Sequence, residues 1–200
     1  MAVISSSRDG VLIWDFNLLQ RQIRNRTLLP DGLTVCSVDY AYSDSDRADD
    51  TAMVAGRVSA EAPTAPSELW LFAAKSERIP ARELQIAMAA FLKKHQPSKT
   101  IVESTNGSVW LRMLLEAELR RLEINPHIMW LPAHRTKGGK VTRIQNLVKL
   151  HLADRLRLVA ADWTDEFIKQ AERWQGSVRN SCRHDDLLDS SSMLCRFVGA

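Results

Sequence analysis

The stretch LTVCSVD, at Leu33–Asp39, predicts a short β-strand that ends in a carboxylate. Its apolar residues, including Val35 and Val38, indicate a strand buried in the core. A carboxylate at the end of such a strand is costly in free energy unless a cation or hydrogen-bond donors face it. Asp39 is therefore the first residue to which we assign a possible chemical role, and capping of the following turn is its alternative.

The sequence after this run predicts further strands and helices in a defined order. Two more strand-like runs follow at Thr51–Ser59 and 68–74, and the short links between them favour an antiparallel meander. Later signals alternate, with helices expected at 80–95, 107–122, 141–155, 163–174 and 184–198, and strands at 100–103, 127–131 and 156–160. This order is typical of an α/β fold with a mixed sheet flanked by helices.

Residues 1–30 differ in character from the rest. Apolar residues at three- and four-residue steps predict an amphipathic helix over 11–26, and a Pro-Asp-Gly sequence then breaks the chain at 30–32. We interpret 1–30 as an arm or linker and 31–200 as the folded domain. The 200 residues, 45% of them apolar, are enough for one sizeable core.

Charge and cysteine content exclude some classes of protein. The formal net charge of +3 is compatible with a polyanionic partner but is too small to indicate one. The three cysteines lack metal-type spacing, and their odd number without a secretory leader favours reduced thiols. No apolar run approaches the ~20 residues that span a bilayer. We therefore expect a soluble, intracellular protein that is not secreted.

Further carboxylates fall at the ends of predicted elements. Glu103 ends the strand at 100–103, Asp185 and Asp186 open the last helix, and Asp189 lies one turn later. In a mixed sheet the first and fourth strands can be neighbours, which would bring Asp39 and Glu103 together, and the helix start could add Asp185 or Asp186. The alternatives are a loop acid for Glu103 and acids favoured by the helix dipole for the others.

Such a cluster would repel itself. Two unit charges ~4 Å apart cost about 4 kcal/mol at an effective dielectric constant of ~20, and bound divalent cations remove that penalty. Mg²⁺ prefers hard oxygen ligands and keeps several waters, which suits a few carboxylates shared with substrate phosphates. Two Mg²⁺ or Mn²⁺ ions could activate a water and steady the leaving oxygen in phosphodiester hydrolysis.

Three segments carry a resemblance to a known family. VDYA at 38–41, IVESTNG at 101–107 and HDDLLDS at 184–190 resemble the nuclease domain of phage terminase large subunits. The resemblance implies a ribonuclease H-like fold, shared with Holliday-junction resolvases, and an endonuclease that cuts concatemeric double-stranded viral DNA during packaging. Carried over, the metal ligands would be Asp39, Glu103 and Asp186, with Asp185 as the next choice for the last position.

The resemblance also implies supporting residues and partners. Asp189 could support or bridge a second ion, and His184 could orient a carboxylate, approach a phosphate or cap the helix. Lys137, Lys140 and Arg143 lie around the Gly138–Gly139 turn and suit phosphate contacts, although a solvated loop and helix start is the alternative. The implied partners are double-stranded DNA, an ATPase motor domain, the terminase small subunit and the portal, in the cytoplasm of the host cell.

Rival functions remain open at this point. No glycine-rich phosphate loop is present for an ATPase motor, and the lack of such turns also disfavours a kinase-like ATPase. A resolvase for branched DNA would use the same acids on the same fold. A non-catalytic nucleic-acid-binding module could keep the fold without metal. Hydrolysis through Ser or Cys is disfavoured because no Gly-x-Ser-x-Gly elbow occurs.

Overall fold

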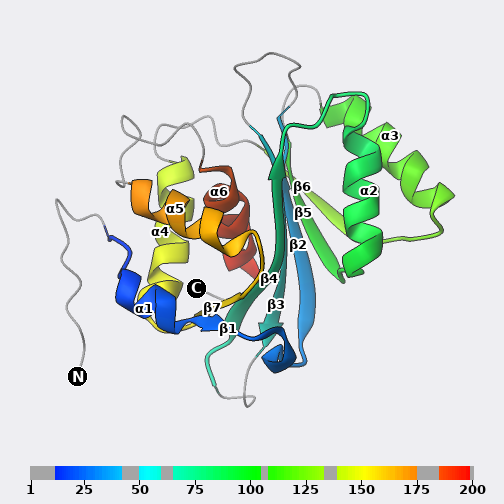
Figure 1. Cartoon of the computed structure of the whole chain (residues 1–200). Helices are drawn as coiled ribbons and strands as arrows, with labels where there is room; N and C mark the ends of the chain where they lie inside the picture. Colours follow the sequence, from blue (N-terminus) through cyan, green and yellow to red (C-terminus); the bar gives the residue numbers. More distant parts are fainter. Residues whose placement is uncertain are drawn as a thin grey trace.

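A mixed β-sheet with helices on both faces organises the molecule (Figure 1). The computed structural model describes residues 12–41, 50–59, 65–104, 108–132, 139–174 and 185–198. The strands are β1 (Ile23–Arg24), β2 (Leu33–Asp39), β3 (Thr51–Ser59), β4 (Glu68–Glu77), β5 (Lys99–Ser104), β6 (His127–Pro132) and β7 (Leu156–Val159). The helices are α1 (Phe16–Arg21), α2 (Leu84–His95), α3 (Ser108–Arg121), α4 (Gly139–Leu152), α5 (Thr164–Arg173) and α6 (Asp186–Met193), with 3₁₀ turns at Arg26–Leu28 and Leu194–Phe197.

The sheet has seven strands in the order β1-β7-β4-β3-β2-β5-β6. The antiparallel meander expected from the sequence is confirmed, because β3 pairs antiparallel with both β2 and β4. The remaining pairs, β2 with β5, β5 with β6, β4 with β7 and β1 with β7, are parallel. The expected adjacency of the first and fourth predicted strands is also confirmed, since Ser37 of β2 lies opposite Ile101 of β5.

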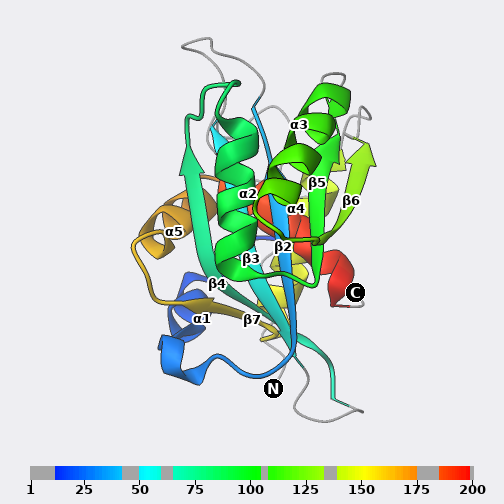
Figure 2. The same cartoon turned by 90° about the vertical axis from the view of Figure 1, so that its right-hand side faces the viewer.

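Each face of the sheet has its own apolar core. Helices α1, α4, α5 and α6 cover one face, and α2 and α3 cover the other (Figures 1 and 2). Because side chains alternate along a strand, β2 contributes Val35 to the first core and Cys36 and Val38 to the second. Ser37 and Asp39 therefore belong to the face that α6 covers.

The N-terminal stretch differs from the prediction of a long helix over 11–26. Only Phe16–Arg21 is α-helical, and Asp15 caps its start by accepting a hydrogen bond from the backbone N–H of Leu18 (3.0 Å). The chain then pairs Ile23 with Leu158, so β1 extends the sheet beside β7. An available strand edge has outweighed the helical periodicity of the sequence, and Leu19 is almost fully buried in the first core.

The last predicted helix, 184–198, is also divided. The α-helix ends at Met193 and the chain tightens into a 3₁₀ turn from Leu194. This turn lies close to the sheet: a Cβ added at Gly56 of β3 would be 3.1 Å from a side-chain carbon of Leu194. Within the described ranges, no helix is both long and apolar enough to span a membrane.

Candidate metal centre

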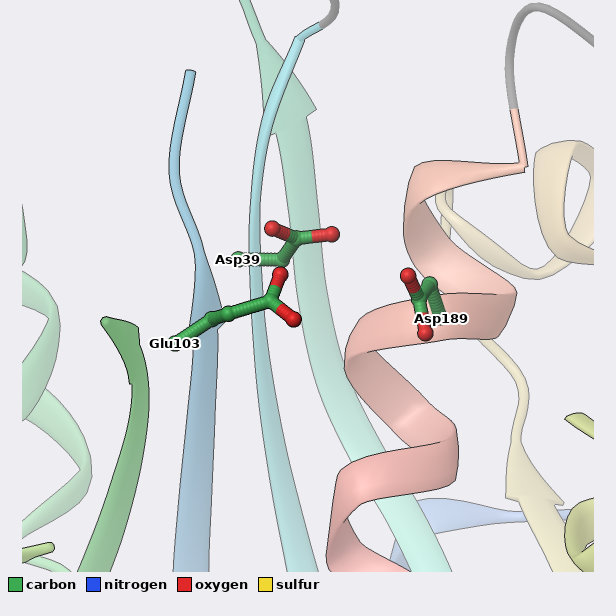
Figure 3. A group of neighbouring side chains, drawn as sticks. All are labelled: Asp39, Glu103 and Asp189. Carbon is green, nitrogen blue, oxygen red and sulfur yellow. The ribbon is translucent and has the colours of Figure 1, made fainter. Parts of the chain in front are cut away.

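Three carboxylates converge at one edge of the sheet. Oxygen atoms of Asp39, Glu103 and Asp189 lie within 4.8 Å of one another. Asp39 ends β2, Glu103 is the penultimate residue of β5, and Asp189 projects towards both from α6 (Figure 3). The structure thus brings together two strand-end acids and one helix acid that were proposed from the sequence.

The strands place the first two acids. β2 and β5 run parallel as neighbours, so their carboxyl ends meet at the same edge of the sheet. Ser37 and Ile101 lie opposite each other, and two residues further along each strand Asp39 and Glu103 emerge on the same face. Both side chains remain partly accessible at the end of a buried strand.

Buried polar contacts hold helix α6 to β2 on one side and to α5 on the other. The hydroxyl of Ser37 donates to the backbone carbonyl of Ser190 (2.7 Å), next to Asp189. At the start of α6, the side-chain oxygen of Gln170 accepts hydrogen bonds from the backbone N–H groups of Leu187 and Leu188 (3.0 and 3.4 Å). Asp185 is the N-cap residue of α6, but its side chain makes no capping hydrogen bond. Gln170 supplies the capping acceptor in its place.

Two cations of α4 face the acids. The guanidinium of Arg143 donates to both oxygens of Asp189 (2.8 Å each) and to Oε1 of Glu103 (2.8 Å). The Nζ of Lys140 lies 2.6 Å from Oδ1 of Asp185 and 3.6 Å from Oδ2 of Asp189. Two of the three residues predicted to contact DNA, Lys140 and Arg143, therefore pair with candidate metal ligands.

The electrostatics of the cluster reflect crowding of negative charge. Burial, followed by the charges of Asp189 and Glu103, holds the pKa of Asp39 well above its usual range. Burial likewise raises the pKa of Asp189, although Arg143 and Lys140 oppose the shift. Burial alone would lower the pKa of Lys140, but the charges of Asp189 and Asp185 outweigh it and raise that pKa. The arrangement favours uptake of a proton or a further cation.

The other acids of the last helix lie close by but in different roles. Asp185 is the N-cap of α6 and Asp186 its first residue, and both are buried. Asp186, favoured from the sequence as the last ligand, is not one of the three converging carboxylates, whereas Asp189 is. Asp185 and Asp189 are four residues apart on one helix face, which explains why Lys140 reaches both. Lys137 and His184 fall outside the described residues.

Sequence reasoning missed the residues that hold the acids in place. Ser37 is an ordinary strand residue by composition, and Gln170 sits inside an amphipathic helix without any motif. A polar residue two positions before a strand-end acid was the only local signal for Ser37. For Gln170, the buried position on α5 and its distant partners depend on tertiary packing.

The residues present fit a divalent cation. Carboxylate oxygens are hard ligands, and a set of three leaves coordination positions for water and phosphate, as Mg²⁺ requires. Oδ2 of Asp185 is buried, and no described residue hydrogen-bonds to it, one turn from Asp189. Together with the raised pKa of Asp39, this orphaned oxygen indicates a site whose negative charge exceeds its resident positive charge.

Comparisons with known proteins agree with this architecture. No protein-family model and no curated protein matches the sequence. Among solved structures, the nuclease domain of the large terminase subunit of bacterial virus Sf6 is similar, with a TM-score of 0.65 at 8% identity over 90% of this chain and 96% of that one. The large terminase nuclease domain of P22 gives 0.59 at 11% identity, covering 90% and 88%.

A third similar structure is the large terminase nuclease domain of Thermus phage P74-26. Its TM-score is 0.53 at 13% identity, over 94% of this chain and 86% of that one. At such identities the likeness concerns the fold. The chain therefore has the ribonuclease H-like fold of the nuclease domains of large terminase subunits.

Proposed function

We propose that the chain is a metal-dependent endonuclease that cuts double-stranded DNA, and that its biological substrate is concatemeric viral DNA during genome packaging. The observation that carries the proposal is the convergence of Asp39, Glu103 and Asp189 at the carboxyl edge of the sheet. The shared fold supports it, and one similar structure is a mutant Sf6 nuclease domain with manganese (TM-score 0.57, 8% identity, 82% and 88% covered).

In this proposal the acids act as ligands. Asp39, Glu103 and Asp189 would hold Mg²⁺ or Mn²⁺, with Asp185 available to a second ion through its orphaned oxygen. The bound ions would supply Lewis acidity for the attack of water on a phosphodiester. Asp39 must give up the proton that its raised pKa favours before it can bind metal, because only the carboxylate form is a strong ligand.

The protein's own cations have a complementary role. Arg143 and Lys140 lie on one side of α4 at the margin of the site, where their charges would attract a phosphate backbone. Lys137, three residues before Lys140, is proposed to add a further phosphate contact. Contacts of this kind orient the duplex without reading its sequence, so little sequence specificity is expected.

A second candidate function is a non-catalytic nucleic-acid-binding module. The pairing of Arg143 with both Glu103 and Asp189 favours it, because an acid cluster with its own cations can persist without metal. The partner proteins of a terminase, namely an ATPase motor domain, the small subunit and the portal, remain part of the first proposal alone.

Cleavage of supercoiled plasmid in Mn²⁺, Mg²⁺ or EDTA tests the proposal, with Asp39→Asn beside the wild type. We expect nicking and linearisation that require metal and fall about a thousandfold or more in the variant, which corresponds to about 4 kcal/mol of lost transition-state stabilisation. Asp165→Asn is the matched control, since Asp165 is an exposed acid on α5 outside the cluster. Folded wild-type protein without cleavage in either metal would support the binding module instead.

A further inference from the structure

Arg143 makes an unusual set of contacts for a surface-edge arginine. Its Nε and one terminal nitrogen both reach Oδ1 of Asp189 (3.0 and 2.8 Å), and the same terminal nitrogen reaches Oδ2 (2.8 Å). The other terminal nitrogen reaches Oε1 of Glu103 at 2.8 Å. One guanidinium therefore engages two of the three converging carboxylates.

These contacts use the oxygens that a metal ion would need. The planar fork of an arginine matches carboxylate geometry and binds it in charge-assisted hydrogen bonds, so the pairing is strong. Both oxygens of Asp189 are engaged, which leaves that carboxylate with reduced capacity for a cation on the same side. Lys140 differs, since its near contact is with Asp185 and it lies 3.6 Å from Asp189.

The formal charges of the carboxylates and cations at this site limit how many metal ions it can hold while Arg143 is paired. Once Asp39 has lost its proton, as metal binding requires, Asp39, Glu103, Asp185 and Asp189 contribute four formal negative charges, while Lys140 and Arg143 contribute two positive ones. The remaining two negative charges match one divalent cation. A second divalent cation would leave two excess positive charges, of which withdrawal of Arg143 from the carboxylates removes one and an arriving phosphate removes the other.

We propose that Arg143 has two positions. Its guanidinium pairs with Glu103 and Asp189 while the site lacks metal, and it turns to a phosphate of the DNA when metal ions bind. This inference rests on the proposed function. Arg143 is then a positioning residue that couples metal binding to DNA binding, because whatever removes the guanidinium from the carboxylates makes it available to the duplex. By linkage, DNA strengthens metal binding by the same factor by which metal strengthens DNA binding.

The position of Arg143 is suited to such a movement. Its side chain is 18% exposed, compared with 4% for Asp189, so it reaches the acids from the solvent side. Rotation of its long side chain needs no change in the backbone of α4. The same fork that binds two carboxylate oxygens binds phosphate oxygens with equal geometry.

Calorimetric titration of Mn²⁺ into the DNA-free protein tests the competition directly. We expect Arg143→Gln to bind Mn²⁺ at least about tenfold more tightly than the wild type, because a cation that competes for the ligands has been removed. Arg143→Lys, which keeps the charge but loses the fork, should fall between the two. Arg157→Gln is the matched control, since Arg157 pairs with Glu68 and Asp154 away from the site.

Anisotropy of a labelled duplex tests the second position. In EDTA, Arg143→Gln should bind DNA within about twofold of the wild type, since the guanidinium is held by carboxylates. In Ca²⁺, which also takes oxygen ligands, the variant should bind the duplex at least about fivefold more weakly than the wild type. In the wild type the released guanidinium contacts a phosphate, and the variant has no guanidinium to do so. An equal loss in EDTA and Ca²⁺ would mean a permanent DNA contact and would overturn the proposal.

The outcomes separate this inference from the proposed function. Weaker or unchanged Mn²⁺ binding by a folded Arg143→Gln protein, beside clear binding by the wild type, would show that Arg143 only braces the ligands. That result overturns the two positions of Arg143 and leaves the nuclease proposal intact. Absence of Mn²⁺ binding by the wild type would overturn both.

Discussion

The two ends of α4 each contact a cluster of buried polar side chains. The cluster at the C-terminal end is balanced, because its donors and acceptors are paired, and the cluster at the N-terminal end is unbalanced, because it has more carboxylates than cations. At the C-terminal end, Nδ1 of His151 pairs with Oε1 of Gln22 (2.6 Å), and Nε2 accepts a hydrogen bond from the backbone N–H of Asp15 (3.0 Å). The side-chain nitrogen of Gln22 donates back to the carbonyl of His151 (2.9 Å). At the N-terminal end, Lys140 and Arg143 face more carboxylates than they can neutralise.

The difference separates structure from function. Every polar side-chain atom of His151 and Gln22 has a hydrogen-bond partner, the carboxylate of Asp154 among them, and this network specifies one packing arrangement and fastens the N-terminal stretch onto the domain. An excess of buried charge does not stabilise a fold and is retained where a ligand completes it. The same helix thus contributes a structural lock at one end and an incomplete site at the other.

The largest expected effect is the difference in cleavage rate between variants of two acids of α6. Asp189→Asn is expected to reduce metal-dependent plasmid cleavage about a thousandfold or more, because it removes a ligand of the converging group. Asp186→Asn, three residues earlier on the same helix, should retain cleavage within about tenfold, since Asp186 is not in that group. A reversed order of the two variants would restore Asp186 to the ligand position that the sequence favoured.

The balanced end should be sensitive to pH. Burial lowers the pKa of His151 to about 4 from an ordinary value of 6.5, so the unfolded chain binds more protons between these values. The contribution of neutral His151 to the free energy of unfolding is complete above about pH 6.5. It is lost as the pH falls towards 4, a loss of about 3 kcal/mol in all. His151→Gln should unfold with a shallower pH dependence over this window in urea titrations.

A control for this measurement is present in the chain. Burial also lowers the pKa of His95 to about 4, and that residue lies on the opposite face of the sheet. Its share of the pH dependence should survive in His151→Gln. If the variant kept the full slope of the wild type between pH 4 and 6.5, the His151 network would not be the source.

Much of this architecture was accessible from the sequence. Three consecutive strand-like runs with short links predicted the meander of β2, β3 and β4, and Leu33–Asp39 and Thr51–Ser59 have the predicted bounds. The strand-end positions of Asp39 and Glu103 followed from the same patterns. Local signals were sufficient here because each strand has a run of at least four consecutive buried residues.

The remainder depended on contacts between distant residues. The helical periodicity around Leu19 was real, but it could not show that Ile23 would pair with β7. The choice among the acids of α6 depends on how that helix is rotated against the sheet, which Ser37 and Gln170 set from other elements. The four-residue spacing of Asp185 and Asp189 was the available hint, since both lie on the face turned towards Lys140.

Metal should stabilise the unbalanced end alone. At a Mn²⁺ concentration about 100 times the dissociation constant, a single site adds about 2.7 kcal/mol to the free energy of unfolding. For a chain of this size that corresponds to a rise of about 5–10 °C in the unfolding midpoint. The rise should vanish in Asp189→Asn and persist in His151→Gln, as differential scanning fluorimetry with Mn²⁺ and EDTA would measure. A rise of equal size in all three proteins would place the metal elsewhere.

The smallest effect concerns the link between α5 and the site. Gln170→Leu removes the acceptor for two buried N–H groups at the start of α6, which should cost about 1–2 kcal/mol of stability, as for a lost helix cap. It should also lower cleavage, because the turn that it caps leads directly to Asp189. Gln145→Leu is the matched control, since Gln145 exchanges two 3.0 Å hydrogen bonds with the backbone of Leu12 at the periphery. That variant should lose comparable stability and keep its cleavage rate, so an equal loss of cleavage in both would reduce Gln170 to a general contributor to folding.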